Sequence, residues 1–431
     1  MEKESLKKSL KPIHLWAIAV GLVISGDYFG WSYGYQVATP WEFLVSTVLI
    51  SIFYICFAFS FTELTTAIPK AGGPFAYSRK ALGDIGGFIA GFATLVEFLF
   101  APPAIASALG AYLHFLIPDI PQIPAAVAAI VLFTLINLLG VYQTARFELF
   151  VTIIASFGIL LYILQVAPHF DFKHIGLSGN LRWSSVFATI PFSIWFYLAL
   201  EGVAMAAEET ENPTKDIPLG YSLGIGTLVF FAMGIMILTS GLGISEELSK
   251  TDNPLPRALL FIKGEKTLLV SIFTFFGLFG IMASLLGIIL GYSRQIFALS
   301  RENYLPKFLS HLNPKTHSPD LACLLGGVLG IIFILLGKTD KLITLSVMGA
   351  IVMYIISMVG LFVLRKKFPE MKRPYKTPLY PFLPAISLLL GIVCLISVVY
   401  NNWDLFLIFV FGFLLNLLLF LVRKKYMSSK A

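Results

Sequence analysis

Charge is the property that this sequence lacks most. Only 13% of its 431 residues are Asp, Glu, Lys or Arg, whereas 57% are hydrophobic. A soluble domain carries about 25% charged residues, so a water-soluble fold of this length would have too few polar side chains to cover its surface. The mean hydropathy of +0.85 points the same way. We therefore predict an all-α integral membrane protein whose apolar surface faces lipid.

Cysteines, histidines and enzyme motifs are also scarce. The three cysteines, Cys56, Cys323 and Cys394, lie far apart in apolar segments and lack the spacing of metal ligands. All six histidines fall at or beyond the edges of the apolar segments, which argues against a histidine proton relay inside a membrane. The sequence contains no HExxH helix and no nucleophile paired with a histidine. We predict no metal, no cofactor, no catalytic residue and no enzymatic activity.

Long apolar runs are abundant instead. A helix of about 20 apolar residues crosses the hydrocarbon core of a bilayer. We predict twelve such helices, at 13–34, 42–66, 84–115, 122–140, 145–167, 186–208, 217–241, 268–298, 319–337, 340–364, 378–400 and 404–422. An even number of spans places the tails 1–12 and 423–431 on the same side of the membrane.

The basic residues indicate which side that is. If both tails are cytoplasmic, 23 of the 31 Lys and Arg residues lie on the cytoplasmic side, in agreement with the positive-inside rule. Their placement at membrane edges also explains the net charge of +7 without a nucleic-acid partner. We predict a multi-pass protein of a bacterial cytoplasmic (inner) membrane with both termini in the cytoplasm, and the sequence leaves the oligomeric state undetermined.

Two of the predicted spans contain an acid next to glycine. In the first span Asp27 lies among glycines that recur at every fourth position, a spacing typical of close helix contacts: Gly26, Gly30 and Gly34. Helix contact alone does not account for Asp27, because an acid at the centre of a span costs about 2.5–3.5 kcal/mol. In the sixth span Glu201 precedes Gly202, with Pro191 upstream. We therefore predict that helices 1 and 6 are broken.

The positions of these two breaks also predict the internal organisation. Interrupted helices at corresponding places in two halves indicate a transport site, because unwound backbone can contact substrate and ions. The breaks are five spans apart. This spacing predicts two five-helix repeats of inverted topology, at 13–167 and 186–364, followed by helices 11 and 12 at 378–422.

Four motifs resemble the amino acid–polyamine–organocation superfamily of secondary carriers. They are PKAGGPFAY at 69–77, NLLGV at 137–141, the run from Glu201 through EETENP to Pro218, and SRQIFALSRENYLP at 293–306. The resemblance implies a LeuT-like core of ten helices that alternates between outward-open and inward-open states. It also implies that substrate binds between broken helices 1 and 6, near helices 3 and 8.

One departure from the amino acid carriers concerns the substrate. Those carriers have a small, glycine-rich break in helix 1 whose amides receive the substrate carboxylate. Here the break carries Asp27, and a carboxylate beside a carboxylate is repulsive. The runs VISGDYFGWSYG and LEGVAMAAEET look most like ethanolamine permeases. The predicted function is therefore transport of a small organic ammonium, with ethanolamine as the predicted substrate. The alternative is that the chain is an amino acid or polyamine permease or exchanger of the same superfamily.

Three acids lie deep in the predicted spans. Our hypothesis is that Asp27 and Glu97 form the ammonium site, and that Glu201 contacts substrate or holds the broken helix. A purely structural hydrogen bond is the open alternative for Glu97 and Glu201. Aromatic rings attract an ammonium within about 6 Å. The predicted substrate-binding residues are Asp27, Glu97, Glu201, Gly26, Tyr28, Phe29, Trp195 and Tyr197.

The driving force is left open by the sequence. Protonation of an acid such as Glu97 or Glu148 would give proton coupling, and Ser284 is a weak candidate for a sodium ligand. Uniport driven by the membrane potential is the third possibility, because one positive charge gains about 2.3 kcal/mol per 100 mV.

Overall fold

The computed structural model describes most of the chain, namely residues 10–70, 72–139, 145–177, 180–314, 316 and 318–428. Most of the N-terminal tail, the end of the C-terminal tail and the last two residues of the 137–141 motif lie outside the described residues. Within this part of the chain the regular elements are helices, apart from one isolated bridge between Leu10 and Thr210. The predicted all-helical class is confirmed.

The first half of the chain forms helices that are interrupted at two places. In order they are α1 (Pro12–Val23), α2 (Ser25–Tyr28), η1 (Trp31–Gln36), α3 (Pro40–Ala67), α4 (Gly73–Leu116), α5 (Gln122–Leu138), α6 (Ala145–Val166), η2 (Ala167–His169), η3 (Phe172–Ile175), α7 (Trp183–Ala188), α8 (Ile190–Trp195) and η4 (Leu200–Glu209). The elements named η are 3-10 helices.

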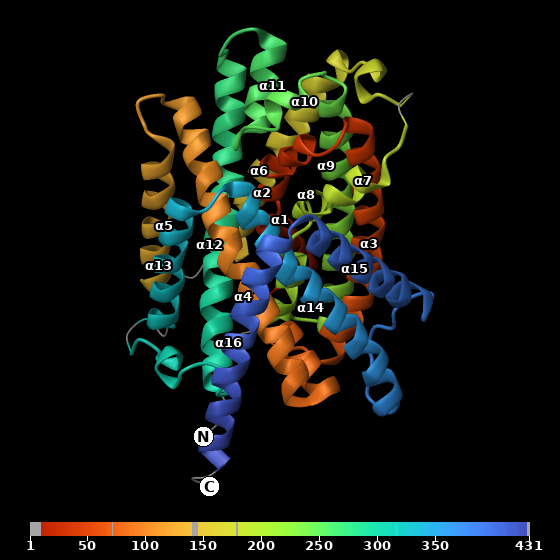
Figure 1. The fold of residues 1–431 in the computed structure, drawn as a ribbon, viewed down its shortest axis with the longest axis vertical. Helices are drawn as coiled ribbons and strands as arrows, with labels where there is room; N and C mark the ends of the chain where they lie inside the picture. Colours follow the sequence, from red (N-terminus) through yellow and green to blue (C-terminus); the bar gives the residue numbers. More distant parts are fainter. Residues whose placement is uncertain are drawn as a thin grey trace.

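The second half contains longer helices. They are α9 (Pro213–Ser240), α10 (Ser245–Leu248), α11 (Pro254–Lys263), α12 (Leu268–Arg301), η5 (Lys307–Ser310), α13 (Asp320–Leu336), α14 (Thr339–Lys367), α15 (Phe382–Asn401) and α16 (Trp403–Ser428). Figure 1 shows these helices as an upright bundle with α10 and α11 at the top and the last turns of α16 at the bottom, and we call these the upper and lower ends.

Nine helices of the described chain are long and apolar enough to cross a membrane. Three further apolar helices, α1, α5 and α13, have 12, 17 and 17 residues. Each of the twelve predicted segments overlaps one of these helices, and the sixth is the interrupted stretch Ile190–Ala207, which comprises α8 and most of η4. Because α1 is too short to cross a bilayer alone at about 1.5 Å per residue, the count of twelve spans and the inverted repeat stay predictions.

Local sequence explains where several helices begin or bend. Thr39 caps α3: its hydroxyl accepts a hydrogen bond from the Glu42 amide, and the Glu42 carboxylate accepts one from the Thr39 amide in return. The helix α4 begins about ten residues before the predicted span and changes direction at Gly83, whose φ of 77° suits glycine. The resulting helix of 44 residues packs along α14 and α12.

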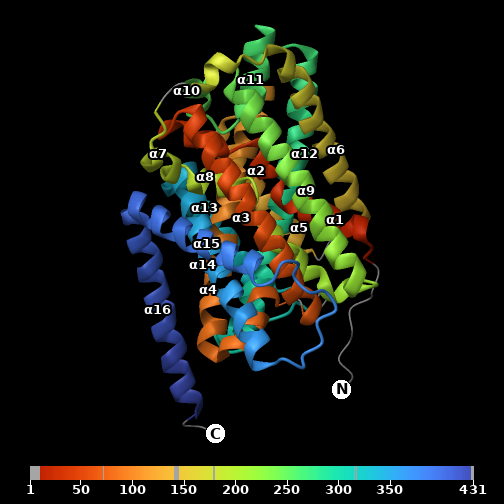
Figure 2. The same ribbon diagram turned by 90° about the vertical axis from the view of Figure 1, so that its right-hand side faces the viewer.

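The helices differ in how deeply they lie in the bundle. α1 packs against α9, α6, η4 and α12, so the first break is enclosed by protein. α16 lies along one edge of the bundle in Figure 2, and most of its side chains are exposed. The exposed faces of α16 and α15 are rich in leucine and isoleucine, as expected for lipid-facing helices.

Candidate functional site

Helix 1 is interrupted by a side chain from another helix. In a regular helix the Ser25 amide would donate to the Gly21 carbonyl. Here the Ser25 amide donates to Ser284 Oγ on α12 at 3.2 Å, and Ser284 Oγ donates to the Gly21 carbonyl at 2.6 Å. A hydroxyl inserted into the hydrogen-bond ladder separates α1 from α2, which is a recognised cause of helix kinks.

The helical path ends four residues later. Phe29 is extended, with φ of −156°, and Gly30 has φ of 88°, a conformation that favours glycine. The chain then continues as the 3-10 helix η1. The predicted break in helix 1 is therefore present, as a loosening at Ile24 followed by a full interruption at Phe29 and Gly30.

Helix 6 is interrupted in a similar way. α8 ends at Trp195, and Ala199 adopts a left-handed conformation with φ of 75°, which is unusual for a residue with a side chain. The chain resumes as the 3-10 helix η4, with Glu201 in its first turn. The predicted break thus lies at 196–199, directly before the acid.

The two interruptions contact each other. A Cβ on Gly26 would overlap the backbone carbonyl oxygen of Trp195, and a Cβ on Gly30 would overlap its indole ring. The Phe29 and Trp195 rings meet edge to face with centroids 5.5 Å apart. Gly26 and Gly30 therefore do serve the close contact that their spacing indicates, and this contact joins the two broken segments.

Asp27 is fully buried at the end of α2. Its exposed fraction is 0%, and neither carboxyl oxygen has a hydrogen-bond partner among the described residues. The Tyr28 and Tyr197 side chains lie close enough to interact with it electrostatically. The structure therefore gives Asp27 two aromatic neighbours and leaves its carboxyl group available for a ligand or a proton.

Glu97 and Glu201 form a second group. Glu97, on α4, is 1% exposed and Glu201 is 0% exposed, and their carboxyls are close enough to interact. Tyr354 Oη on α14 donates to Glu201 Oε2 at 3.2 Å. Both Glu97 oxygens and Glu201 Oε1 have no hydrogen-bond partner within the described chain. Our hypothesis joined Glu97 to Asp27, whereas the structure brings Glu97 next to Glu201.

The four predicted aromatic residues are all buried, but they point in different directions. Tyr28 lies between α6 and α12, and its hydroxyl donates to the Ala155 carbonyl at 2.7 Å. Phe29 and Trp195 pack on each other at the breaks. The Tyr197 hydroxyl shares a hydrogen bond of 2.6 Å with Ser51 Oγ on α3. Tyr28 therefore faces the helix interface, while the Tyr197 hydroxyl is bound to α3.

Two further tyrosines, Tyr54 and Tyr354, lie at this centre, and the sequence analysis did not identify them. Tyr54 on α3 packs its ring 4.9 Å from that of Tyr197, and its hydroxyl shares a hydrogen bond of 2.9 Å with that of Tyr354. Both tyrosines lie near Glu97 and Glu201. A hydroxyl-bearing residue in an apolar span is a weak hint of a polar interior, but the chain has 17 tyrosines and the pattern does not single out these two.

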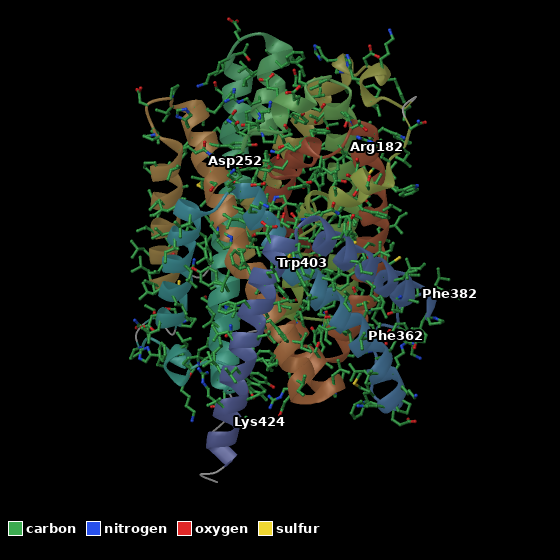
Figure 3. The ribbon with its side chains drawn as sticks, in the orientation of Figure 1. Arg182, Asp252, Phe362, Phe382, Trp403 and Lys424 are labelled. Carbon is green, nitrogen blue, oxygen red and sulfur yellow. The ribbon has the colours of Figure 1, made fainter. Side chains whose placement is uncertain are left out.

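The upper end of the bundle is held together by Asp252, which lies between α10 and α11. Tyr33 Oη donates to its Oδ1 at 2.5 Å, and Gln122 Nε2 and Thr339 Oγ1 donate to its Oδ2 at 3.0 and 3.2 Å. Figure 3 shows Asp252 at this end and Lys424 at the other. Burial raises the pKa of the Asp252 carboxyl above its ordinary value, and the three hydrogen bonds oppose the shift. Sequence analysis assigned no function to this loop.

The bundle has a cavity at its upper end and another at its lower end. At the upper end a cavity of about 440 Å³ is lined by Tyr33, Gln122, Asp252 and Thr339. At the lower end a cavity of about 860 Å³ lies between the start of α4, the end of η4 and the end of α12, and Arg79 and Glu302, which form an ion pair, line it. The two cavities therefore lie at opposite ends of the bundle.

The electrostatics of the centre decide what it can bind. Among the described residues no Lys, Arg or His forms an ion pair with Asp27, Glu97 or Glu201. An ionised carboxylate inside protein without a partner costs several kcal/mol. The centre can lower this cost by taking up a cation or protons, and it disfavours an anion.

Comparison with known proteins agrees with this architecture. The family model for amino acid permeases matches residues 10–416. An uncharacterized transporter of Rhizobium meliloti is 30% identical over 89% of this chain and 85% of its own length. The resemblance to the amino acid–polyamine–organocation superfamily is thereby confirmed, and so is the expectation of a membrane transporter.

Two Bacillus subtilis relatives are named as carriers of amino acids. The branched-chain amino acid permease BcaP is 24% identical, covering 98% of this chain and 94% of the permease. The serine/threonine exchanger SteT is 26% identical, covering 90% of each chain. A family model that spans nearly the whole chain, together with a bundle whose two broken helices meet at buried acids, leads to one conclusion: the chain belongs to the amino acid permease family of membrane transporters.

Proposed function

We propose that this chain carries a small organic ammonium across the cytoplasmic membrane by alternating access, with ethanolamine as the preferred substrate. One observation carries the proposal: Asp27 and Glu201 at the two breaks, and Glu97 beside Glu201, are buried and form no ion pair among the described residues. An incoming ammonium would neutralise one of them in a dry environment, where charge pairs are stronger than in water. The resemblance of the helix 1 and helix 6 runs to ethanolamine permeases supports the choice of substrate.

Asp27 is the residue to which we assign the ammonium. It follows Gly26, which contacts the other break, and the Tyr197 side chain is close enough to interact with its carboxyl group electrostatically. The face of an aromatic ring contributes about 0.5–2 kcal/mol to binding of a cation. Glu97 and Glu201 would accept the substrate hydroxyl or hold protons, with Tyr354 fixing the orientation of Glu201.

An amino acid substrate is the second candidate, because the names of BcaP and SteT specify amino acids. For this candidate the substrate carboxylate would have to lie near the helix 1 break. Asp27 would repel it there, since like charges within a few ångströms cost free energy in a medium of low dielectric. A small zwitterion would therefore bind less well than the corresponding amino alcohol.

Transport of labelled ethanolamine into proteoliposomes distinguishes these candidates. We expect saturable uptake that excess unlabelled ethanolamine abolishes and that glycine, alanine or leucine at the same concentration does not reduce. Imposed proton, sodium and potential gradients in the same vesicles would identify the driving force. Competition by an amino acid, together with uptake of that amino acid and none of ethanolamine, would favour the second candidate instead.

The Asp252 cluster gives a test of alternating access. In the proposed orientation the upper end faces outward, and it can open only if the hydrogen bonds from Tyr33, Gln122 and Thr339 to Asp252 break. Hydrogen bonds to charged groups contribute about 1.5–3 kcal/mol each. We therefore expect Asp252→Ala to shift the protein toward outward-open states.

Labelling of a cysteine would measure this shift. Ser107 lines the upper cavity, so a Ser107→Cys reporter can be placed in a background in which the three native cysteines are replaced. We expect Asp252→Ala to accelerate labelling by an impermeant thiol reagent by at least about tenfold, as a shift of 1.4 kcal/mol would. Asp340→Asn in the same cavity is the control. Equal rates in Asp252→Ala and its parent would contradict a gating role.

A further inference from the structure

A basic segment joins α14 to α15 at the lower end of the bundle and takes no part in the substrate site. It runs from Arg365, in the last turn of α14, to Phe382, the first residue of α15, and Figure 2 shows it as a blue loop. Residues 365–376 contain six Lys or Arg residues and one acid, Glu370. The positive-inside rule accounts for such an excess only by keeping basic residues in water on one side of the membrane. The structure adds that the arginines and the lysines of the basic segment have different surroundings.

A buried glutamate on α3 holds the two arginines. Glu63 is 1% exposed, and Arg365 donates from Nε and Nη2 to its two carboxyl oxygens at 2.8 and 2.5 Å. The Thr377 amide and hydroxyl both donate to Glu63 Oε2 at 2.8 Å. Arg373 Nε lies 3.4 Å from Glu63 Oε1, and Arg373 Nη2 donates to two carbonyls at the end of α14 at 2.9 Å each. Both arginines are therefore bound within the protein, and they tie the basic segment to α3 and α14.

The lysines of the basic segment are exposed instead. Lys366, Lys372 and Lys376 are all exposed, and none of them forms an ion pair among the described residues. Lys367 is exposed too, and its Nζ donates to the Ala81 carbonyl at 3.4 Å. The segment thus presents three ammonium groups on a backbone that the arginines hold in place. An anion that binds to them has little backbone to order, which lowers the free-energy cost of binding.

Exposed apolar side chains follow these lysines directly in the chain. Leu379 is 73% exposed and Phe382 is 67% exposed. The exposed Ile386 and Leu389 lie four and seven residues after Phe382, a spacing that places all three on one face of α15. Figure 3 shows Phe382 at the outer edge of the bundle, on the same side as Phe362 of α14. The basic segment therefore leads from exposed ammonium groups to an apolar stripe that continues along a lipid-facing helix.

From this arrangement we infer that the basic segment is a docking surface for an anionic phospholipid of the adjacent leaflet, which is the cytoplasmic leaflet in the predicted orientation. The exposed lysines bind the phosphate of the headgroup, and Leu379 and Phe382 contact the acyl chains. Basic clusters directly beside a membrane-spanning helix attract anionic lipids. A soluble anion would use the lysines alone, whereas an anionic phospholipid matches both the charged and the apolar part of the segment.

Fluorescence quenching by brominated lipid measures this docking at the surface itself. Phe382→Trp adds a tryptophan at the apolar end of the basic segment, and its signal is the difference from the protein with its six native tryptophans. The full-length protein is placed in vesicles of phosphatidylglycerol and phosphatidylcholine, with bromine on the chains of one lipid at a time. We expect phosphatidylglycerol to bind beside this reporter at least about fivefold more strongly than phosphatidylcholine, because one lysine next to the membrane contributes about this factor.

Matched lysine variants separate this surface from general positive charge at the lower end. Lys372→Gln combined with Lys376→Gln should reduce the preference for phosphatidylglycerol to within about twofold of none. Because both side chains are exposed, the thermal stability of this variant in detergent should equal that of the wild type. Lys215→Gln combined with Lys307→Gln removes two exposed charges at the starts of α9 and η5, and this control should keep the preference.

Two further reporters complete the experiment. Leu379→Trp is a second reporter in the basic segment, so the measurement can be made even if Phe382→Trp does not fold. Leu407→Trp, on an exposed position of α16, should show no preference for phosphatidylglycerol.

The inference is supported if the preference is found in the basic segment and depends on Lys372 and Lys376. It is overturned if the reporters in the segment show no preference, if Leu407→Trp shows the same preference, or if the two lysine variants behave alike. Displacement of phosphatidylglycerol by free glycerol 3-phosphate would also overturn it, because the surface would then bind soluble anions. None of these outcomes depends on which substrate the protein carries, so failure of the proposed function would leave the result unaffected.

Discussion

Replacing Asp27 by asparagine is expected to abolish uptake of a cationic amine. The amide has nearly the shape of the carboxylate but no charge, and truncating one partner of a buried charge pair costs about 2–5 kcal/mol. Uptake at low substrate concentration should therefore fall by roughly thirtyfold or more. Initial rates of labelled ethanolamine uptake in proteoliposomes, at matched protein density, measure the effect.

A stability measurement separates this effect from misfolding. Asp27 is buried without a hydrogen-bond partner in the described chain, so its neutralisation should leave the thermal stability of the purified protein unchanged or raise it. Glu246→Gln removes one charge from a side chain that is 90% exposed, and its uptake should stay within about twofold of the wild type. Normal ethanolamine uptake by Asp27→Asn would reject the role that we assign to Asp27.

Replacing Gly26 by alanine should nearly eliminate transport for a steric reason. The added Cβ would overlap the carbonyl oxygen of Trp195, and a backbone atom in the helix 6 break cannot move aside as a flexible side chain can. Overpacking of this kind costs about 1–3 kcal/mol. The two breaks would be forced apart, so we expect a loss of about tenfold or more in uptake rate and a lower melting temperature.

Gly226 on α9 provides the matched control. A Cβ at that position would meet no other atom within 4 Å, so Gly226→Ala adds the same methyl group without a clash. Its transport rate should stay within about twofold of the wild type. Equal uptake by Gly26→Ala and Gly226→Ala would mean that the contact between the two breaks is not needed for transport.

The sequence alone predicts those features that depend on neighbouring residues. Apolar runs specify where helices lie, because lipid-exposed segments must be apolar over their whole length. Asp27 and Glu201 were identifiable because an acid inside such a run is costly and stands beside glycine. Both acids are indeed buried at helix interruptions.

Features that depend on pairs of distant residues could not be predicted in the same way. Ser25 and Ser284 are 259 positions apart, and nothing near Ser25 indicates that a hydroxyl from α12 would divide the helix there. The same applies to the grouping of Glu97 with Glu201 and to the convergence of three elements on Asp252. A polar side chain inside an apolar run can be predicted to be buried from the sequence around it. Its hydrogen-bond partner depends on how the helices pack and cannot be predicted in this way.

The hydroxyl of Ser284 has a consequence for how easily helix 1 can change shape. With Ser284 inserted, the Ser25 amide and the Gly21 carbonyl are both satisfied through the same oxygen atom. If the Ser284 hydroxyl withdraws, the Ser25 amide can donate to the Gly21 carbonyl. The Ser284 hydroxyl can then donate to a backbone carbonyl of α12. A bent and a straight helix 1 then satisfy the same backbone groups, so a tilt of its lower segment leaves no buried amide or carbonyl stranded. Helix 1 can therefore bend at Ser25, and Ser284 on the neighbouring helix α12 stabilises the bent form.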